Sequence, residues 1–206
     1  ENSLGRLWVE GHPQSKLETN WKYYLEEAQQ EEDVVKQLEA IRKEYQKLKP
    51  IDIKVIDPAM GSGHILVYEF EVLMQIYVSE GYAERDAAKQ ILMNNLYGLD
   101  IDDRAYQLSY FALVMKARKY NRRILEEELE LNICSIQESN PIPIRLIELI
   151  SNNDEEIFNQ LEYLYQTFKD AKEYGSILDV KSFDYPKINE LINHFEQSIN
   201  ENLFDM

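Results

Sequence analysis

The chain has 206 residues, 44% of them hydrophobic, which is enough to bury one sizeable core or one core with a helical appendage. It contains only 7 Gly and 6 Pro, so the composition favours helices with short connections over a strand-rich sandwich. Acidic residues outnumber basic residues by 38 to 22, which gives a net charge of −16. Because nucleic-acid binding depends on Lys and Arg that neutralise phosphates, this balance argues against an independent DNA-binding module.

The sequence also indicates a compartment. No apolar run reaches the roughly 18 residues of a membrane span, and the N-terminus has no charged-then-apolar leader. Cys134 is the single cysteine, which excludes an internal disulfide and a cysteine metal cluster. We therefore expect a soluble, cytoplasmic protein without a membrane partner, in which Cys134 is a buried, inert thiol within an apolar strand.

The first fifty residues predict helices. Apolar residues recur at three- and four-residue spacing within residues 4–8 and 21–28, and His12-Pro13 separates these two predicted helices. A third, charge-rich helix is predicted from about residue 31 to residue 48, before Pro50. We expect these helices to serve packing.

A short strand is predicted at residues 51–57, where β-branched residues alternate with others. The strand runs into the turn Pro58-Ala59-Met60-Gly61-Ser62-Gly63, and helical periodicity resumes over residues 64–78. At the carboxyl end of a strand, glycines permit a sharp turn and let a ligand approach the main-chain amides closely. Gly61 and Gly63 are the candidates for this role.

Two further strands are predicted at residues 96–101 and 129–137. The helices between them cover residues 83–95 and a span from Asp102 or Asp103 to about residue 119. Strands that alternate with helices imply parallel pairing with right-handed crossovers. Beyond residue 141 the sequence predicts three helices and a possible short strand, at about residues 142–150, 155–174, 186–203 and 176–180 respectively.

A carboxylate follows the second predicted strand. Asp100 can accept two hydrogen bonds from the vicinal hydroxyls of a ribose, which makes it a candidate nucleoside clamp, and Ile101 would pack on the base. Because neighbouring parallel strands end at one edge of a sheet, we expect Gly61 and Asp100 to lie side by side. The prediction of a nucleoside-binding site depends on the proximity of Gly61 and Asp100.

Two other nucleotide sites fit less well. A dinucleotide site needs three glycines at G-x-G-x-x-G spacing, whereas Leu66 stands at the third position. Its ribose acid follows after about 20 residues, whereas Asp57 and Asp100 are 43 positions apart. No Gly-Lys-Ser/Thr follows the turn, which disfavours a phosphate-loop NTPase. A cofactor with a ribose but no pyrophosphate, such as S-adenosyl-L-methionine, suits the acids at both strand ends.

The two motifs resemble a known family. Residues 57–66, Asp-Pro-Ala-Met-Gly-Ser-Gly-His-Ile-Leu, resemble motif I of N6-adenine DNA methyltransferases of the gamma arrangement, found in type I and type IIG restriction-modification enzymes. Residues 96–102 are similar to their motif II. The resemblance is closest to the methyltransferases of BREX phage-defence systems, which have stretches similar to residues 1–8 and 135–140.

The resemblance implies a partial Rossmann-like methyltransferase fold that binds S-adenosyl-L-methionine. In this family Asp57 and the glycine turn line the methionine end of the cofactor, Asp100 holds the ribose and Ile101 borders the adenine. Gln137 or Glu138, at the end of the third strand, would offer a polar group to the base. The candidate cofactor-binding residues are Asp57, Pro58, Ala59, Gly61, Ser62, Gly63, Asp100, Ile101, Gln137 and Glu138. The expected segments are an N-terminal helical layer, a cofactor-binding half-domain and a helical segment, at residues 1–50, 51–140 and 141–206.

The catalytic signature of the family, Asn-Pro-Pro-Tyr, does not occur in the sequence, and Asn140-Pro141-Ile142-Pro143 lacks its adjacent prolines and its aromatic residue. We assign no catalytic residue, and we expect His64 to be a packing or capping residue. The chain is expected to be an inactive fragment of a larger enzyme, in which other segments hold DNA and defence-complex proteins are partners. The alternatives are a non-catalytic interaction module of a defence complex and a methyltransferase that acts on RNA, protein or a small molecule.

Overall fold

The computed structural model describes the backbone of residues 1–204, and the side chains of residues 1–195 and of Gln197. It contains two compact units, Glu1–Ser135 and Ile136–Met206. Residues 1–50, predicted as a separate helical layer, lie in the first unit together with the sheet. The second unit begins at Ile136, a few residues before the boundary that the sequence suggests at residue 140. Among the described residues, no helix combines the length and the apolar character needed to cross a bilayer.

The first unit contains a three-stranded parallel sheet with the strand order β1-β2-β3. Its strands are β1 (Val55–Asp57), β2 (Leu96–Asp100) and β3 (Asn132–Ser135). Asp57 pairs in register with Gly98, and Asp100 pairs with Ser135, so the carboxyl ends of all three strands meet at one edge. The predicted partial Rossmann-like α/β fold is thereby confirmed.

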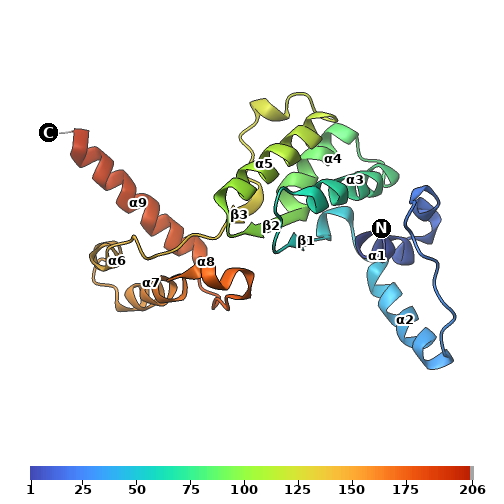
Figure 1. Ribbon diagram of the computed structural model, residues 1–206, viewed down its shortest axis with the longest axis horizontal. Helices are drawn as coiled ribbons and strands as arrows, with labels where there is room; N and C mark the ends of the chain where they lie inside the picture. The colour runs from blue at the N-terminus through green and yellow to red at the C-terminus, as the bar shows by residue number, and fades with distance from the viewer. Residues whose placement is uncertain (205–206) are drawn as a thin grey trace. The chain divides into compact units, whose positions relative to one another are not determined.

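Helices α3 (His64–Ser79), α4 (Glu84–Gln90) and α5 (Asp103–Arg118) connect the strands, and a π-helical turn, Ile91–Asn95, leads into β2 (Figure 1). The long helices bury apolar side chains completely or almost completely against the sheet; they include Leu66, Phe70, Leu73, Ile76 and Leu113. Each such side chain contributes roughly 1.5–3 kcal/mol to folding. This core fixes the distance between β1, β2 and the helices that begin at their ends.

A buried polar residue sets the start of β1. Asn95 is fully buried, and its Nδ2 donates to the carbonyl oxygens of Pro50 and Ile53, both at 2.7 Å. Its Oδ1 accepts a 3.0 Å hydrogen bond from the hydroxyl of Tyr77, and burial raises the pKa of Tyr77 to about 12. Residues Pro50–Asp52 form a 3-10 turn, which explains why β1 is shorter than the strand predicted at residues 51–57.

The N-terminal region forms helices α1 (Leu4–Gly11) and α2 (Glu32–Tyr45), as predicted. The helix predicted at residues 21–28 is wrong, because residues 21–31 are irregular. Trp21 packs on Gly5 and donates from Nε1 to Oε1 of Gln75 at 3.0 Å, whereas Leu25 is 65% exposed. The spacing of these apolar residues therefore reflects a few separate anchor points and not one helix face.

Side chains on β3 alternate between the two faces of the sheet. Ile133 is buried in the core with residues of α5, while Cys134, the next residue, is exposed. The prediction of a buried thiol is therefore wrong. On β1, Ile56 is also exposed, at 59%. An apolar strand sequence predicts burial on both faces, but the helices of the first unit cover these strands on only one.

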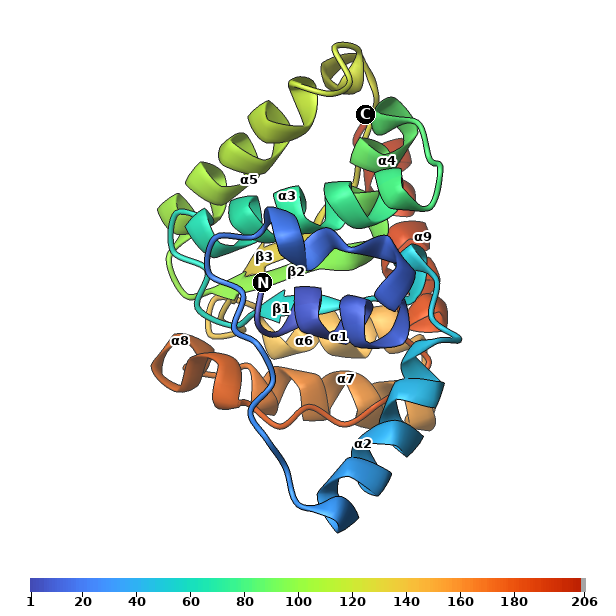
Figure 2. The same cartoon turned by 90° about the vertical axis from the view of Figure 1, so that its right-hand side faces the viewer.

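The second unit is helical, with α6 (Ile144–Ser151), α7 (Glu155–Thr167), α8 (Ala171–Tyr174) and α9 (Tyr185–Phe204) (Figure 2). Its small core is made of four buried residues: Ile147, Ile157, Leu161 and Ile188. The helix predicted at residues 155–174 is divided near Asp170, whose φ of 53° is left-handed. The short strand suggested at residues 176–180 is wrong, because a 3-10 turn and irregular backbone occupy this segment.

Candidate functional site

The turn between β1 and α3 is tied to β2 by its backbone. The amide of Met60 donates to the carbonyl oxygen of Leu99 at 2.9 Å, and the amide of Gly63 donates to that of Met60 at 2.8 Å. The amide of Ala59 donates to Oδ1 of Asp57 at 3.1 Å. The turn therefore has a defined position at the carboxyl edge of the sheet.

The two glycines of this turn have different roles. Both have left-handed backbones, with φ of 54° at Gly61 and 77° at Gly63. A Cβ atom on Gly63 would lie 2.9 Å from Oγ of Ser109 and 3.1 Å from its Cα, so Gly63 allows α5 to approach. A Cβ atom on Gly61 would meet no heavy atom within 4 Å, which leaves the backbone open to a ligand.

Asp100 contacts this turn directly. Its Oδ2 accepts a 2.8 Å hydrogen bond from the amide of Gly61, and its Oδ1 accepts a 3.0 Å hydrogen bond from the amide of Asp102. The structure therefore brings Gly61 and Asp100 together. An ionised carboxylate has about four acceptor positions, so two remain for a ligand such as a diol. Ile101 follows and is 47% exposed.

The opposite end of the site contains a carboxylate that lacks a full set of partners. Asp57 is only 8% exposed, and its Oδ2 is inaccessible to solvent without a hydrogen-bond partner. An unpaired buried charge is costly, so this oxygen is suited to a cationic or hydrogen-bond-donating ligand. Of the remaining turn residues predicted to bind, Pro58 and Ala59 are exposed and Ser62 is half-buried.

Glu69 is a candidate site residue that no sequence motif marks. It lies on α3, and its Oε2 is also inaccessible and without a partner. Burial, followed by the nearby Asp57 carboxylate, raises the pKa of Glu69 to about 7. Glu69 and Glu71 both interrupt an apolar helix, but Glu71 pairs with Lys116 and accepts a hydrogen bond from Tyr120. Only the structure distinguishes the paired acid from the unpaired one.

Replacing Glu69 with Gln is expected to change how stability depends on pH. The folded pKa lies above the ordinary value, so folding favours the protonated acid, and this contribution is lost as pH rises from about 4.5 to 7. Glu69→Gln should match the wild type near pH 4.5 and exceed its stability above pH 7 by about 1 kcal/mol, since partial exposure weakens the effect. Urea unfolding at both pH values measures this difference. An equal change in the free energy of unfolding at both pH values would contradict the prediction.

A cavity of about 380 Å³ opens beside Glu69. It is lined by residues of α1 and α3 and by two residues that precede α1: Glu1, Ser3, Leu4, His64, Ile65, Tyr68, Glu69 and Val72. His64 is exposed at the first position of α3, and Gly63 is the N-cap residue of this helix. The expectation that His64 is a packing or capping residue stays a prediction.

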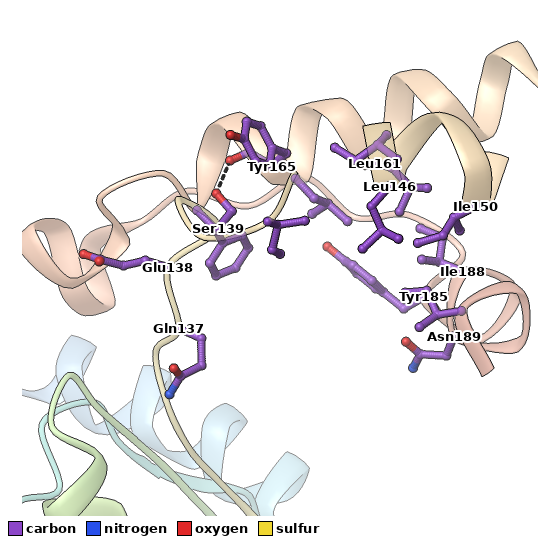
Figure 3. Close-up of a pocket in the computed structure, with 15 residues that line it drawn as sticks. Gln137, Glu138, Ser139, Leu146, Ile150, Leu161, Tyr165, Tyr185, Ile188 and Asn189 are labelled. Carbon is purple, nitrogen blue, oxygen red and sulfur yellow. Dashed lines mark hydrogen bonds between the residues drawn. The ribbon is translucent and has the colours of Figure 1, made fainter. Parts of the chain in front are cut away.

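Gln137 and Glu138 belong to the second unit, where they line an apolar cavity of about 420 Å³ between α6, α7 and α9. Figure 3 shows the carboxylate of Glu138 directed away from the apolar side chains of this cavity. Its Oε1 accepts a 3.4 Å hydrogen bond from the amide of Lys172, and Oγ of Ser139 donates to the carbonyl oxygen of Tyr165. The assignment of Gln137 and Glu138 to the cofactor base stays a prediction.

Comparison with known proteins identifies the family of the chain. Residues 25–176 match the family described as "MmeI, DNA-methyltransferase domain". The matched segment contains the glycine turn, Asp57, Asp100 and the whole sheet. It covers most of the chain.

Two curated relatives are similar to the chain. The "Adenine-specific methyltransferase PglX" of Lacticaseibacillus casei (strain Zhang) is 38% identical over 207 residues, which cover 95% of this chain and 17% of the relative. The "Adenine-specific methyltransferase BrxX" of Escherichia coli O9:H4 (strain HS) is 50% identical over 139 residues, which cover 68% of this chain and 11% of the relative. The chain thus spans less than a fifth of either relative. With a parallel sheet, a glycine turn and a strand-end carboxylate in place, the chain belongs to the family of MmeI-type DNA-methyltransferase domains.

Proposed function

We propose that the chain is the S-adenosyl-L-methionine-binding part of a DNA adenine-N6 methyltransferase of a restriction-modification or BREX-type defence system. The observation that carries the proposal is the 2.8 Å hydrogen bond from the Gly61 amide to Oδ2 of Asp100. It places a glycine turn open to a ligand and a carboxylate at the same edge of the sheet. The family and the names of both relatives support the same reading.

The residues present fit this cofactor in shape and charge. Asp100 retains acceptor positions for the two ribose hydroxyls, and the exposed Ile101 offers an apolar surface to adenine. The unpaired Oδ2 of Asp57 suits the positively charged methionine end, and Glu69 adds negative charge there once ionised. Pro58, Ala59, Ser62 and Gly63 would line the cofactor between these ends.

These contacts suggest separate roles for the cofactor and for the residues of the chain. The cofactor supplies an electrophilic methyl group when bound. This chain's residues would hold the ribose, cover the adenine and pair with the charged end of the cofactor. Adenine N6 is paired inside duplex DNA, so the base must be flipped out before transfer.

The isolated chain is proposed to bind the cofactor without transferring its methyl group, because the sequence contains no Asn-Pro-Pro-Tyr to hold a flipped base. Segments of the longer protein would hold most of the DNA, and defence-complex proteins would be its partners. A DNA substrate also implies a cytoplasmic enzyme.

A methylation assay with a longer protein that contains this chain tests the proposal. Asp100→Ala should lower N6-methyladenine formation in duplex DNA by about 100-fold at subsaturating cofactor, since the ribose contacts are lost. Asp33→Ala is the matched control, because Asp33 is an exposed acid on α2. Full activity of the Asp100 variant, or methylation of RNA or protein in place of DNA, would refute the proposal.

A further inference from the structure

The end of α5 concentrates positive charge on an acidic chain. Five of the eight residues at 116–123 are basic, although the net charge of the chain is −16. Four of the five are exposed and are called the α5 basic cluster below: Arg118, Lys119, Arg122 and Arg123. The fifth, Lys116, is half-buried and pairs with Glu71.

The backbone beneath the cluster is held firmly. Ala117, Asn121 and Ile124 are buried at 0%, 3% and 1% exposure, and they alternate with the exposed basic residues. The amide of Asn121 donates to the carbonyl oxygen of Ala117 at 2.8 Å, and its Oδ1 accepts a 3.1 Å hydrogen bond from the amide of Arg123. The cations therefore project from an ordered turn and not from a loose tail.

The charges of this cluster are largely uncompensated. Within the described part of the chain, no carboxylate lies within 4 Å of Arg118, Arg122 or Arg123, and Lys119 approaches Glu71 only at 4.0 Å. Glu127, in the acidic run that follows, is paired with Lys89 at 2.7 Å. The three arginines are thus available to an external anion.

The surface is also hollowed around the same side chains. One shallow cavity of about 510 Å³ is lined by Met115, Arg118, Lys119 and Arg122. A second, of about 280 Å³, is lined by Arg85, Tyr120, Asn121, Arg122 and Arg123. Arg122 borders both cavities, so anions bound in them would be adjacent.

Helix stability alone does not explain the cluster. Cations near the last turn of a helix interact favourably with its dipole, which accounts for Arg118 and Lys119. Arg122 and Arg123 lie beyond α5, and this effect falls off within one turn. The exposure of Arg122 and Arg123 on an ordered turn is best explained by a binding partner outside the chain.

We propose that the α5 basic cluster contacts the phosphate backbone of duplex DNA, away from the cofactor site. Planar guanidinium groups bind phosphate oxygens in pairs, and duplex DNA presents about one negative charge per 1.7 Å of its axis, which suits closely spaced cations. The inference rests on the proposed function, because the DNA-methyltransferase family makes DNA the expected polyanion. It adds a defined DNA contact to a chain whose net charge is otherwise repulsive.

The cluster is separate from the cofactor clamp. Helix α5 begins just after Asp100 and has 16 residues, so its two ends are about 24 Å apart. Both views show α5 running from the carboxyl edge of the sheet to the turn that follows it (Figures 1 and 2). Substitutions in the cluster should therefore leave cofactor binding unchanged.

Fluorescence anisotropy with a labelled duplex of about 20 base pairs tests the proposal across a range of salt concentrations. The chain should bind with a Kd of about 10–100 µM at low salt, independently of sequence. Arg118→Ala/Arg122→Ala/Arg123→Ala should weaken binding at least about tenfold and reduce the slope of log K against log salt by about three, one unit per lost phosphate contact. The matched control is Lys36→Ala/Lys43→Ala on α2 combined with Lys47→Ala just beyond it, which removes the same charge from exposed positions and should leave the slope unchanged.

Three results would overturn the inference: equal losses in both triple variants, absence of DNA binding at low salt, or displacement of DNA by polyglutamate at equal charge concentration. Calorimetry with S-adenosyl-L-methionine and thermal unfolding on the same proteins separate this inference from the proposed function. If the cluster variant loses DNA binding while both the wild type and this variant fail to bind cofactor, the DNA contact stands and the proposed function fails. If cofactor binding is normal and DNA binding does not depend on the cluster, only the DNA contact is refuted.

Discussion

Replacing Asp100 with Ala is expected to weaken S-adenosyl-L-methionine binding about 100-fold. Two hydrogen bonds from ribose hydroxyls to an ionised carboxylate contribute about 3 kcal/mol together, and 1.4 kcal/mol corresponds to a factor of ten in Kd. The same substitution removes the acceptor for the Gly61 amide, so the turn also loses its tie to β2. Isothermal calorimetry on the chain gives the Kd directly.

The conservative variant separates these two effects. Asp100→Asn keeps one acceptor oxygen for the Gly61 amide but loses the charge, so its Kd should lie between those of the wild type and Asp100→Ala. Asp33→Ala, a remote exposed acid, should bind like the wild type. A Kd for Asp100→Ala within about threefold of the wild-type value, a shift of about 0.7 kcal/mol, would show that this carboxylate does not hold the ligand.

Replacing Gly63 with Ala is expected to lower the free energy of unfolding by about 2–5 kcal/mol. A left-handed backbone costs a residue with a side chain about 1–2 kcal/mol, and overpacking against Ser109 adds about 1–3 kcal/mol. The new Cβ would lie 3.1 Å from the Cα of Ser109, a backbone atom that cannot simply rotate away. Urea unfolding followed by circular dichroism measures the loss.

Gly61→Ala is the matched control within the same turn. Its backbone is also left-handed, but a Cβ there meets no atom within 4 Å, so the cost should be limited to about 1–2 kcal/mol. If both variants were equally unstable, the close approach of α5 to Gly63 would not be the reason for that glycine.

Much of this architecture was predictable because three local signals agree. Alternating β-branched residues mark β1, a glycine turn follows it, and Asp102 caps α5 by accepting a 2.9 Å hydrogen bond from the amide of Arg104. Adjacent parallel strands must end at the same edge, so Gly61 and Asp100 could be placed together from the sequence. The arrangement of these strand ends depends on local backbone geometry, which the sequence encodes well.

Other features depend on contacts between distant segments. The spacing of residues 21–28 suits a helix, but the hydrogen bond of Trp21 to Gln75 and its packing on Gly5 hold that segment irregular. Cys134 has apolar neighbours in sequence, yet its exposure depends on which face of the sheet the helices cover. Helix packing likewise decides that Glu71 pairs with Lys116 while Glu69 is buried near Asp57. The raised pKa of Glu69 therefore could not be predicted from the sequence.

The Gly61 turn and Asp100 are proposed to bind an adenosyl group together. Titration of the isotope-labelled chain with S-adenosyl-L-methionine, followed by two-dimensional NMR, tests it most directly. The amide signals of Gly61, Gly63 and Ile101 should shift together with one dissociation constant, while those of Arg122 and Arg123 stay in place. Saturable shifts confined to other residues, with the Gly61 and Ile101 signals unmoved, would contradict it.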